Sequence, residues 1–409
     1  MNLYAEKAKW IISLFLFLYI FYSGIYKTWG VILNDFSNYY VSSQILIHNE
    51  DYSILYQDSK FNDEVKKYGI TQESKFSQYP PITAIIMIPL TVFDAIQAKN
   101  IWMIINVIVL FFCVLLVKNL FLISLTDIIF IFSLTGYSLI NNFAFGQFYI
   151  VLLFLILLSL YLAEKGYLLL SGLLLGFATI VKILPVILIF WFIINRKWKS
   201  VFYSTVSAAV FFIIEWIIFG KEISSQYWFS ILPGHLNSDL ILQSPYAFSF
   251  QSWNSLLLNL FVYNEQFNQF PGYNSISLYF ILKYLIYGLV SLSVVINIRT
   301  LLKSKKSGND LLLILFIGSL LLLPASATYH FILLVIPFSI LLKSDSFSLR
   351  EKTAVFLLFF FIGFIPLNRI TPLHLTGFST ILHFPRLICL TFIFIILTTQ
   401  YWKANTSEI

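Results

Sequence analysis

Asp35 is the residue whose position in the sequence first indicates chemistry. It follows an apolar run over 10–33 that is long enough to cross a bilayer, and it lies in the segment Asn34-Asp35-Phe36-Ser37-Asn38-Tyr39-Tyr40. A carboxylate at a membrane surface, among aromatic and amide side chains, is costly to keep there without a use. Such a group can act as a general base that takes the proton of an attacking hydroxyl. The alternative interpretation of Asp35 is a helix cap or a solvated loop acid.

Three further polar side chains lie within or between apolar runs. Lys182 lies inside the run over 167–195, where a cation needs a partner such as a phosphate group or the carboxylate of Glu215. Arg386, just inside the last run, has the geometry to hold a phosphate with two hydrogen bonds. His330 could hydrogen-bond an acceptor, assist proton transfer or contact the phosphate. The alternative for Lys182 is a structural ion pair or a side chain that snorkels to the interface, and the alternative for His330 is a satisfied interfacial histidine.

The composition indicates the class of protein that must position these side chains. Of the 409 residues, 59% are hydrophobic and only 11% are charged, whereas charged residues make up about a quarter of a typical soluble domain. Apolar runs recur along the chain, and they predict an all-α polytopic membrane protein with about twelve transmembrane helices. Because no periodic repeat stands out, we expect one membrane-embedded domain over 1–409.

Two long polar stretches, 31–78 and 220–276, interrupt the apolar runs. Lys7 and Lys9 place the amino terminus inside under the positive-inside rule, which puts both stretches on the outer face. The net charge of +7 comes from basic residues gathered at the ends of apolar runs, so it does not indicate nucleic-acid binding. We expect an integral protein of the plasma (inner) membrane of a bacterium or archaeon, with its site on the outer face.

Prolines make the middle of the chain irregular. The apolar segment over 80–93 is shorter than the roughly 20 residues that a span needs, and it is consistent with a half-helix. Pro80 and Pro81 predict an extended approach followed by the start of a helix. Pro185 divides the run over 167–195 and is expected to mark a turn or a kink. These two segments decide which face carries Gln147 and Lys182, and charge counting leaves that open.

Five sequence blocks, taken together in order, resemble glycosyltransferase family 87, whose members are polyprenyl-phosphate-dependent mannosyltransferases of the GT-C fold. The blocks are Asp35-Phe36 and Tyr39-Tyr40 with Asp51-Tyr52 and Leu55-Tyr56; Gln78-Tyr79-Pro80-Pro81-Ile82 with Pro89; Gly146-Gln147-Phe148; the glycine-rich stretch 171–178 with Val181-Lys182-Ile183-Leu184-Pro185; and Pro324-Ala325-Ser326-Ala327-Thr328-Tyr329-His330 with Pro337. The sequence departs from the family pattern where a histidine pair is reduced to His330 and where Tyr149 and Asn38 replace the usual residues. These departures bear on the sugar preference more than on the reaction class.

The resemblance implies a hexosyltransferase of mannosyltransferase type, with a polyprenyl-phosphate-sugar donor, a glycan or glycolipid acceptor, and membrane lipids around the donor chain. One base and a direct displacement would invert the anomeric centre, because retention needs a second carboxylate beside the first. Asp51 and Asp58 could supply one only if the loop folds back. The residues and the resemblance together lead us to expect catalytic roles for Asp35 and His330 and substrate contacts for Lys182, Gln147, Tyr39, Tyr79 and Arg386. Arg386 lies beyond the family blocks, and its expected role comes from its own chemistry.

The sequence contains no signature of a metal or cofactor site. The outer stretches have no Asp-x-Asp pair, and the chain has no His/Cys ligand spacing and no nucleotide-binding glycine loop. We therefore expect neither a metal nor a cofactor. A soluble nucleotide-sugar donor is correspondingly less favoured than a lipid-linked donor.

Two other classes of membrane protein compete with this interpretation. A multi-span transporter or lipid flippase without catalytic activity would fit about twelve spans equally well. Against it, the sequence shows no internal repeat, and its strongest polar clusters lie in loops. A glycan polymerase or ligase of another membrane fold would need arginines in its large outer loop, and the stretch 220–276 contains none.

Overall fold

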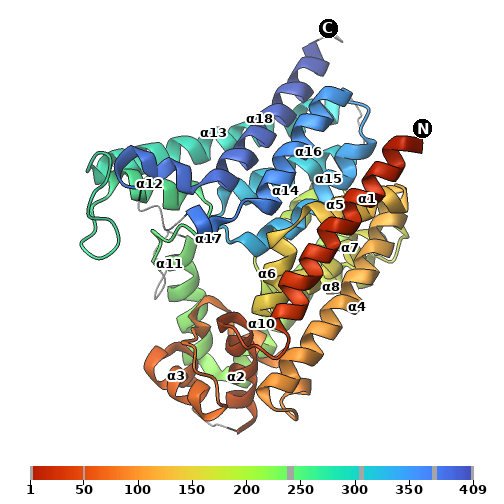
Figure 1. The fold of residues 1–409 in the computed structure, drawn as a ribbon. Coiled ribbons are helices and arrows are strands. Elements are labelled where there is room, and N and C mark those ends of the chain that lie inside the picture. The colour runs from red at the N-terminus through yellow and green to blue at the C-terminus, as the bar shows by residue number, and fades with distance from the viewer. Residues whose placement is uncertain (1–2, 49–50, 237–243, 304–307, 371–374, 407–409) are drawn as a thin grey trace. The chain divides into compact units, whose positions relative to one another are not determined.

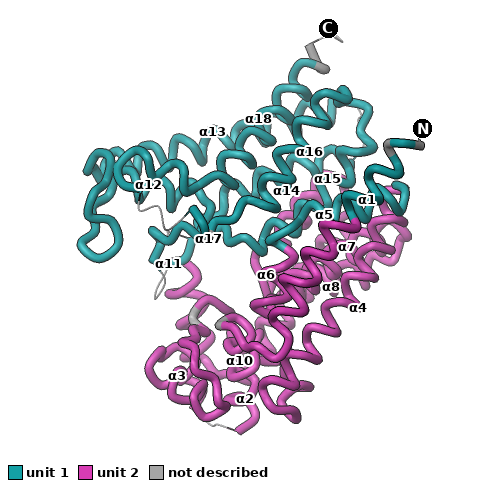
Figure 2. The backbone as a smooth tube through the Cα atoms, in the orientation of Figure 1, with its two compact units in different colours: residues 1–13, 123–138, 235–409 teal, residues 14–122, 139–234 magenta. Residues whose placement is uncertain are grey.

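The computed structural model describes residues 3–48, 51–236, 244–303, 308–370 and 375–406. Within these ranges the chain is helical (Figure 1), and its only β-type pairing is an isolated bridge between Asn264 and Asn268. This confirms the all-α prediction. The chain divides into two compact units (Figure 2): residues 1–13, 123–138 and 235–409 form unit 1, and residues 14–122 and 139–234 form unit 2. The single domain over 1–409 stays a prediction.

Unit 2 contains most of the polar stretch 31–78 and the helices that follow it. Its helices are α2 (Asn34–His48), α3 (Asp58–Lys67), α4 (Ala95–Phe121), α7 (Tyr149–Glu164), α8 (Leu168–Val181), α9 (Val186–Ile194) and α10 (Trp198–Gln226), with π-helical turns at Phe21–Ile25 and Tyr227–Ile231 and 3-10 turns at Tyr26–Thr28, Tyr52–Tyr56, Phe76–Gln78, Pro81–Ile85 and Ile88–Leu90. Three helices cross the boundary between the units: α1 (Leu3–Ile20), α6 (Tyr137–Phe145) and α11 (Leu232–Leu236).

Small residues let the helices of unit 2 approach one another closely. In Figure 1, α4, α7 and α8 run side by side, and α8 also packs along α10. Gly176 of α8 lies so close to α10 that an added Cβ would come within 2.5 Å of the carbonyl oxygen of Ser204. Close backbone approach at small residues is the usual means of packing helices in lipid. The glycine-rich stretch 171–178 therefore has a packing role.

Unit 1 contains the remaining helices, arranged around α14. They are α5 (Leu125–Leu134), α12 (Trp253–Phe261), α13 (Ile276–Lys303), α14 (Gly308–Leu322), α15 (Val335–Lys343), α16 (Leu349–Phe364), α17 (Leu367–Ile370) and α18 (Pro385–Thr406), with 3-10 helices at Thr328–Leu334 and Gly377–His383. Most side chains of α14 are buried, because α13, α15 and α18 all pack against it.

Local sequence signals explain where several helices begin. Asp94 precedes α4 and accepts a hydrogen bond from the backbone N–H of Gln97 (2.8 Å). Ser348 precedes α16, and the Glu351 carboxylate accepts the backbone N–H of Ser348 (2.8 Å) while the Ser348 hydroxyl accepts that of Glu351 (3.4 Å). Such caps satisfy N–H groups that a helix start leaves without intrahelical partners.

Several helices have the length and composition of membrane spans. Five qualify among the residues that the structure describes, and the bent pair α5 and α6 would add a sixth if it forms one span. The five are Glu6–Thr28, Ala95–Phe121, Trp198–Leu236, Ile276–Lys303 and Pro385–Lys403, and shorter apolar helical segments lie at Pro81–Leu90, Tyr149–Glu164, Leu168–Val181, Gly308–Leu322 and Thr328–Lys343. The structure is therefore that of a polytopic membrane protein, while the twelve predicted spans stay a prediction.

The two proline-marked segments have the irregular backbone that the sequence predicts. Pro80 is extended (φ −64°, ψ 149°), and Pro81 opens a short 3-10 turn, so the segment after residue 80 contains no complete span. The run over 167–195 is divided at Lys182, which is extended (φ −146°, ψ 128°), and α9 begins directly after Pro185. Both expectations are confirmed.

Candidate active site

Helix α2 positions Asp35, which lies in its first turn. Most of this helix is buried, and its polar side chains form hydrogen bonds with the backbone of the segment 84–91. Ser43 Oγ donates to the carbonyl oxygen of Ala84 (2.5 Å), and Gln44 Nε2 donates to that of Thr91 (3.1 Å). Because buried polar groups are costly unless they are bonded, these contacts hold α2 in one place. The carboxylate at its start consequently has a defined position.

The hydroxyl of Tyr79 donates a hydrogen bond to Oδ1 of Asp35 (3.2 Å). Tyr39, one turn after Asp35, packs its ring against that of Tyr79 with centroids 4.7 Å apart. The Tyr39 hydroxyl donates to Oε1 of Gln147 (3.3 Å). Gln147 is fully buried, and its Nε2 group has no hydrogen-bond partner among the described residues. Four predicted site residues from three segments of the sequence therefore converge at the start of α2.

The surroundings of Asp35 make its carboxylate a stronger base than a solvated aspartate. Burial raises the pKa of Asp35 above its ordinary value, because the charged form loses solvation. The Gln147 amide, the positive charge of Lys182 and the Tyr79 hydroxyl each act in the opposite direction and lower the pKa. The raising effect of burial is the largest of these. A half-buried base with a raised pKa is suited to removing a proton from a hydroxyl group.

Lys182 reaches this group of residues from the extended break after α8. Its Nζ lies 4.1 Å from the ring centroid of Tyr79, 5.4 Å from that of Tyr149 and 5.9 Å from that of Tyr39. Aromatic faces attract a cation through their quadrupole. They leave its three N–H donors available, which a carboxylate partner would not. We refer to Lys182 with these three tyrosines as the lysine cage.

Glu215, the alternative partner expected for Lys182, is bound elsewhere in unit 2. Its carboxylate accepts the backbone N–H of Ile82 (3.1 Å) and the indole N–H of Trp228 (2.6 Å). Among the ion pairs of the described residues, none joins Lys182 to Glu215. Glu215 thus holds the turn that follows Pro80. The cation of Lys182 interacts instead with the tyrosine rings of the cage and with the charge of Asp35.

A tight turn between α6 and α7 presents Gln147. Gly146 has a positive φ of 67°, and an added Cβ would lie 2.8 Å from Cβ of Phe36, the neighbour of Asp35. Two side chains of α4 hold this turn. Lys99 Nζ donates to the carbonyl oxygen of Phe143 (2.6 Å), and Trp102 Nε1 donates to that of Gly146 (2.9 Å). The spacing between Gln147 and α2 is fixed by these contacts.

Arg386 lies in unit 1, at the start of α18, and each of its three guanidinium nitrogens donates a hydrogen bond. Nε donates to the carbonyl oxygen of Ile362 (2.8 Å) and Nη2 to that of Ile365 (2.8 Å), while Nη1 donates to the hydroxyl of Thr328. The two carbonyls lie at the end of α16, where a helix leaves C=O groups without intrahelical partners. These contacts give Arg386 a structural role in unit 1.

His330 also lies in unit 1, within the 3-10 helix Thr328–Leu334. Its Nδ1 accepts the backbone N–H of Ala327 (3.2 Å), and its ring stands edge-on to that of Tyr329. The histidine therefore closes the start of its own helix. His330 and Arg386 belong to unit 1 and Asp35 to unit 2, and the predicted roles of the first two stay predictions.

The other two acids of the first polar stretch have local partners of their own. Asp51 accepts the backbone N–H of Ser53 (3.0 Å) at the start of a 3-10 turn. Asp58 pairs with Lys75 (3.7 Å). The groups that most affect the pKa of Asp35 include no carboxylate. Within the described ranges, no three His, Cys, Asp or Glu side chains gather as a possible metal-binding set.

Sequence reasoning did not assign a role to Tyr149 or to Lys99. Tyr149 was noted only as a departure from a family pattern, yet its ring forms one wall of the lysine cage. Lys99 is fully buried in α4. A lysine inside an apolar run is a signal in its own right, because such charges are rare and usually functional. That signal was available in the sequence.

A comparison with protein-family models agrees with the resemblance carried by the sequence blocks. The model of glycosyltransferase family 87 matches residues 76–327, which is more than half of the chain. The matched range contains Tyr79, Gln147 and Lys182, and Asp35 precedes it. No curated protein and no solved structure matches the chain. On the strength of the family match, the chain belongs to glycosyltransferase family 87 and is a glycosyltransferase.

Proposed function

We propose that the protein is an inverting glycosyltransferase that uses a polyprenyl-phosphate-sugar donor. It transfers a hexose, mannose by resemblance, to a hydroxyl of a glycan or glycolipid on the outer face of the membrane. The observation that carries the proposal is the convergence of Asp35, Tyr79 and Gln147 beside the lysine cage in unit 2. Family membership favours this reading over a transporter or flippase.

Asp35 is the general base in this proposal. The acceptor oxygen attacks the anomeric carbon, its proton passes to the Asp35 carboxylate, and the bond from the anomeric carbon to the phosphate oxygen breaks. The electron pair of that bond leaves with the polyprenyl phosphate. The hydrogen bond from Tyr79 keeps one carboxylate oxygen oriented, and the raised pKa favours proton uptake.

Lys182 supports departure of the phosphate. An ammonium held by aromatic faces keeps its donors for an incoming anion, and hydrogen bonds to charged groups are the strong ones. The Gln147 amide, which lowers the pKa of Asp35, is a second donor at the site, and we assign its Nε2 group to the sugar or to the phosphate. Positive charge and N–H donors aimed at developing negative charge are a major source of catalysis. The leaving group supplies the driving force, so the reaction needs no nucleotide.

A single carboxylate at the site supports inversion. Retention through a covalent intermediate needs two carboxyl groups about 5 Å apart. Asp51 and Asp58, the two candidates for a second carboxylate, are engaged with Ser53 and Lys75. One base acting on the acceptor is consistent with direct displacement.

Replacing Asp35 by Asn tests the proposal, because it keeps the side-chain shape and removes the base. We expect transfer to fall by at least about 10²-fold. The assay would use polyprenyl-phosphate-mannose and, as acceptor, the glycolipid fraction of cells that lack the gene. The exposed acid Asp51, replaced by Asn, is the matched control and should keep normal transfer. Normal turnover by a folded D35N protein would contradict the assignment of the base.

The folded state of D35N provides an internal check. Because the folded-state pKa of Asp35 is raised, its contribution to stability is present at low pH and is lost as the pH rises through that pKa. Asn removes the ionised form, so D35N should be at least as stable as the wild type at neutral pH. A thermal unfolding measurement in detergent would show this.

A further inference from the structure

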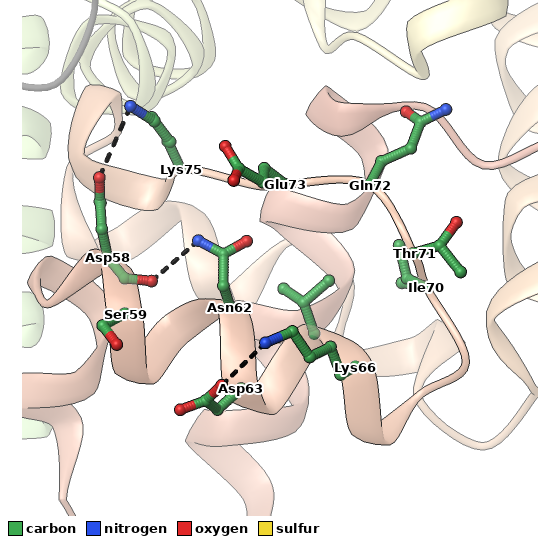
Figure 3. A pocket seen from close by; sticks show the side chains of 11 residues that line it. Asp58, Ser59, Asn62, Asp63, Lys66, Ile70, Thr71, Gln72, Glu73 and Lys75 are labelled. Carbon is green, nitrogen blue, oxygen red and sulfur yellow. Dashed lines mark hydrogen bonds and ion pairs between the residues drawn. The ribbon is translucent and has the colours of Figure 1, made fainter.

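Unit 2 contains a polar groove on its first polar stretch, and the groove is not used in the reaction described above. It lies between α3 and the segment 70–75 and has a volume of about 300 Å³ (Figure 3). Asp58, Asn62 and Lys66 line it from α3, and Thr71 and Glu73 line it from the opposite segment. We refer to it as the α3 groove. Its volume lies at the lower end of the range for small-ligand sites.

The wall of the α3 groove is bonded directly to the helix that carries Asp35. The hydroxyls of Ser74 and Ser37 form a hydrogen bond, and the backbone N–H of Lys75 donates to Oδ1 of Asn38 (2.7 Å). Asn62 closes the groove from the α3 side, because its amide bonds both the N–H (2.8 Å) and the C=O (3.0 Å) of Ser74. A molecule held in the groove would therefore have a fixed position relative to the start of α2.

The chemistry of the groove suits an uncharged polyhydroxyl ligand. Its lining contains carboxylates, ammonium groups, amides and hydroxyls, so it offers both hydrogen-bond donors and acceptors. Asp58 and Asp63 are each paired with a lysine of the groove, while Glu73 is exposed. With three carboxylates against two lysines, the groove does not favour the anionic donor. The acceptor is the remaining substrate, and its sugars match this lining.

We propose that the α3 groove binds a sugar of the acceptor glycan next to the sugar that reacts, and so brings the acceptor hydroxyl to Asp35. This inference rests on the proposed function. Binding energy obtained away from the reacting atoms offsets the entropy lost when two substrates are aligned. Because hydrogen bonds join the groove to α2, the energy of binding a sugar in the groove can be used to orient the acceptor hydroxyl toward Asp35.

A bulky residue in the groove tests the proposal. Thr71 is exposed and lines the groove, and T71W would fill part of it. Lys60 is exposed on α3 outside the groove, so K60W adds the same bulk elsewhere. With polyprenyl-phosphate-mannose as donor and the extracted glycolipid fraction as acceptor, we expect T71W to raise the KM for acceptor about tenfold or more. K60W should keep the wild-type value.

Donor-induced thermal stabilisation should be unchanged in T71W, because the donor occupies a different site. If T71W keeps the wild-type KM for acceptor, or loses donor-induced stabilisation, the proposal is wrong. The paired change of Gln72 and Glu73 to Ala, both exposed, repeats the test without added bulk. It should raise the same KM in a protein whose fold is unperturbed.

A binding measurement separates this inference from the proposed reaction. The acceptor fraction should raise the unfolding temperature of the wild type and of K60W but not of T71W, and this requires no turnover. If D35N retains transfer while T71W loses acceptor binding, the general base is wrong and the groove assignment stands. If T71W is stabilised by the acceptor fraction as strongly as the wild type, the groove assignment fails whatever D35N does.

Discussion

Lys182 in unit 2 and Arg386 in unit 1 received the same prediction from the sequence, yet the two cations have different surroundings. Every nitrogen of the Arg386 side chain already donates to a carbonyl or hydroxyl oxygen of its own unit. The Lys182 ammonium lies against three tyrosine rings, and none of the described ion pairs includes it. A cation in which each side-chain nitrogen is bonded to its own unit stabilises the fold, while one held by aromatic faces can still bind an anion.

The largest effect should come from Arg386→Met, and it should be on stability. The substitution takes the Arg386 donor from two buried groups, the carbonyl oxygen of Ile362 and the hydroxyl of Thr328, at a cost of about 1–3 kcal/mol each. The carbonyl oxygen of Ile365 keeps the backbone N–H of Leu367 as a donor (3.1 Å). We expect the free energy of unfolding to fall by at least about 3 kcal/mol. Arg369→Met, at an exposed arginine of α17, is the control and should be neutral. Denaturation in detergent measures both. A stable R386M protein that no longer binds donor would reverse the comparison.

Lys182→Met should have a smaller effect, and it should be on donor binding. Met keeps the length of the side chain and removes the charge, with roughly 1.5–3 kcal/mol at stake for a charge-assisted hydrogen bond to phosphate. Affinity for polyprenyl-phosphate-mannose should fall about 10- to 150-fold, while stability without donor stays unchanged or rises. Lys165, an exposed lysine over the ring of Tyr161, is the matched control. Loss of stability in K182M with donor binding intact would make Lys182 structural as well.

Tyr79→Phe should have the smallest effect and should separate the two functions of that side chain. It removes the hydroxyl bonded to Asp35 and keeps the ring beside Lys182. Because this hydroxyl lowers the pKa of Asp35, its loss should raise that pKa and move the acid limb of the kcat/KM profile to higher pH. We expect kcat/KM at neutral pH to fall by less than about tenfold and the affinity for donor to be retained. Tyr40→Phe, elsewhere in α2, is the control and should leave the pH profile unchanged. An unshifted profile in Y79F would show that the Tyr79 hydroxyl does not affect the base Asp35.

The sequence predicted individual segments of this protein better than their contacts. The proline signals at Pro80, Pro81 and Pro185 are local, and the structure has the expected turns at each of them. The number of spans is harder to predict, because the length of an apolar run does not show whether it forms one long helix or several short ones. The run over 167–195, for example, is divided into a 14-residue helix and a 9-residue helix. Pro185 predicted a turn or kink in this run, but not that each part would be shorter than a membrane span.

The candidate site could be predicted only in part for the same reason. Asp35, Tyr79, Gln147 and Lys182 lie in four separate segments, and only the order of family blocks suggested that they belong together. The contacts of Arg386 could not be predicted, since two of its partners are backbone carbonyls that every sequence contains. Tyr149 was missed because a tyrosine in an apolar run ordinarily indicates packing.

The close packing of Gly146 against Phe36 leaves no room for a side chain at residue 146. Its turn has a left-handed backbone conformation, and the nearest neighbour of a side chain there would be Phe36, beside the base. One added methyl group would have to displace either the start of α2 or the segment that carries Gln147. A shift of about 1 Å in a reacting group can cost about two orders of magnitude in rate. The alignment of Asp35 therefore depends on the absence of a side chain at residue 146. At that position the volume of a substituted side chain would matter more than its charge or polarity.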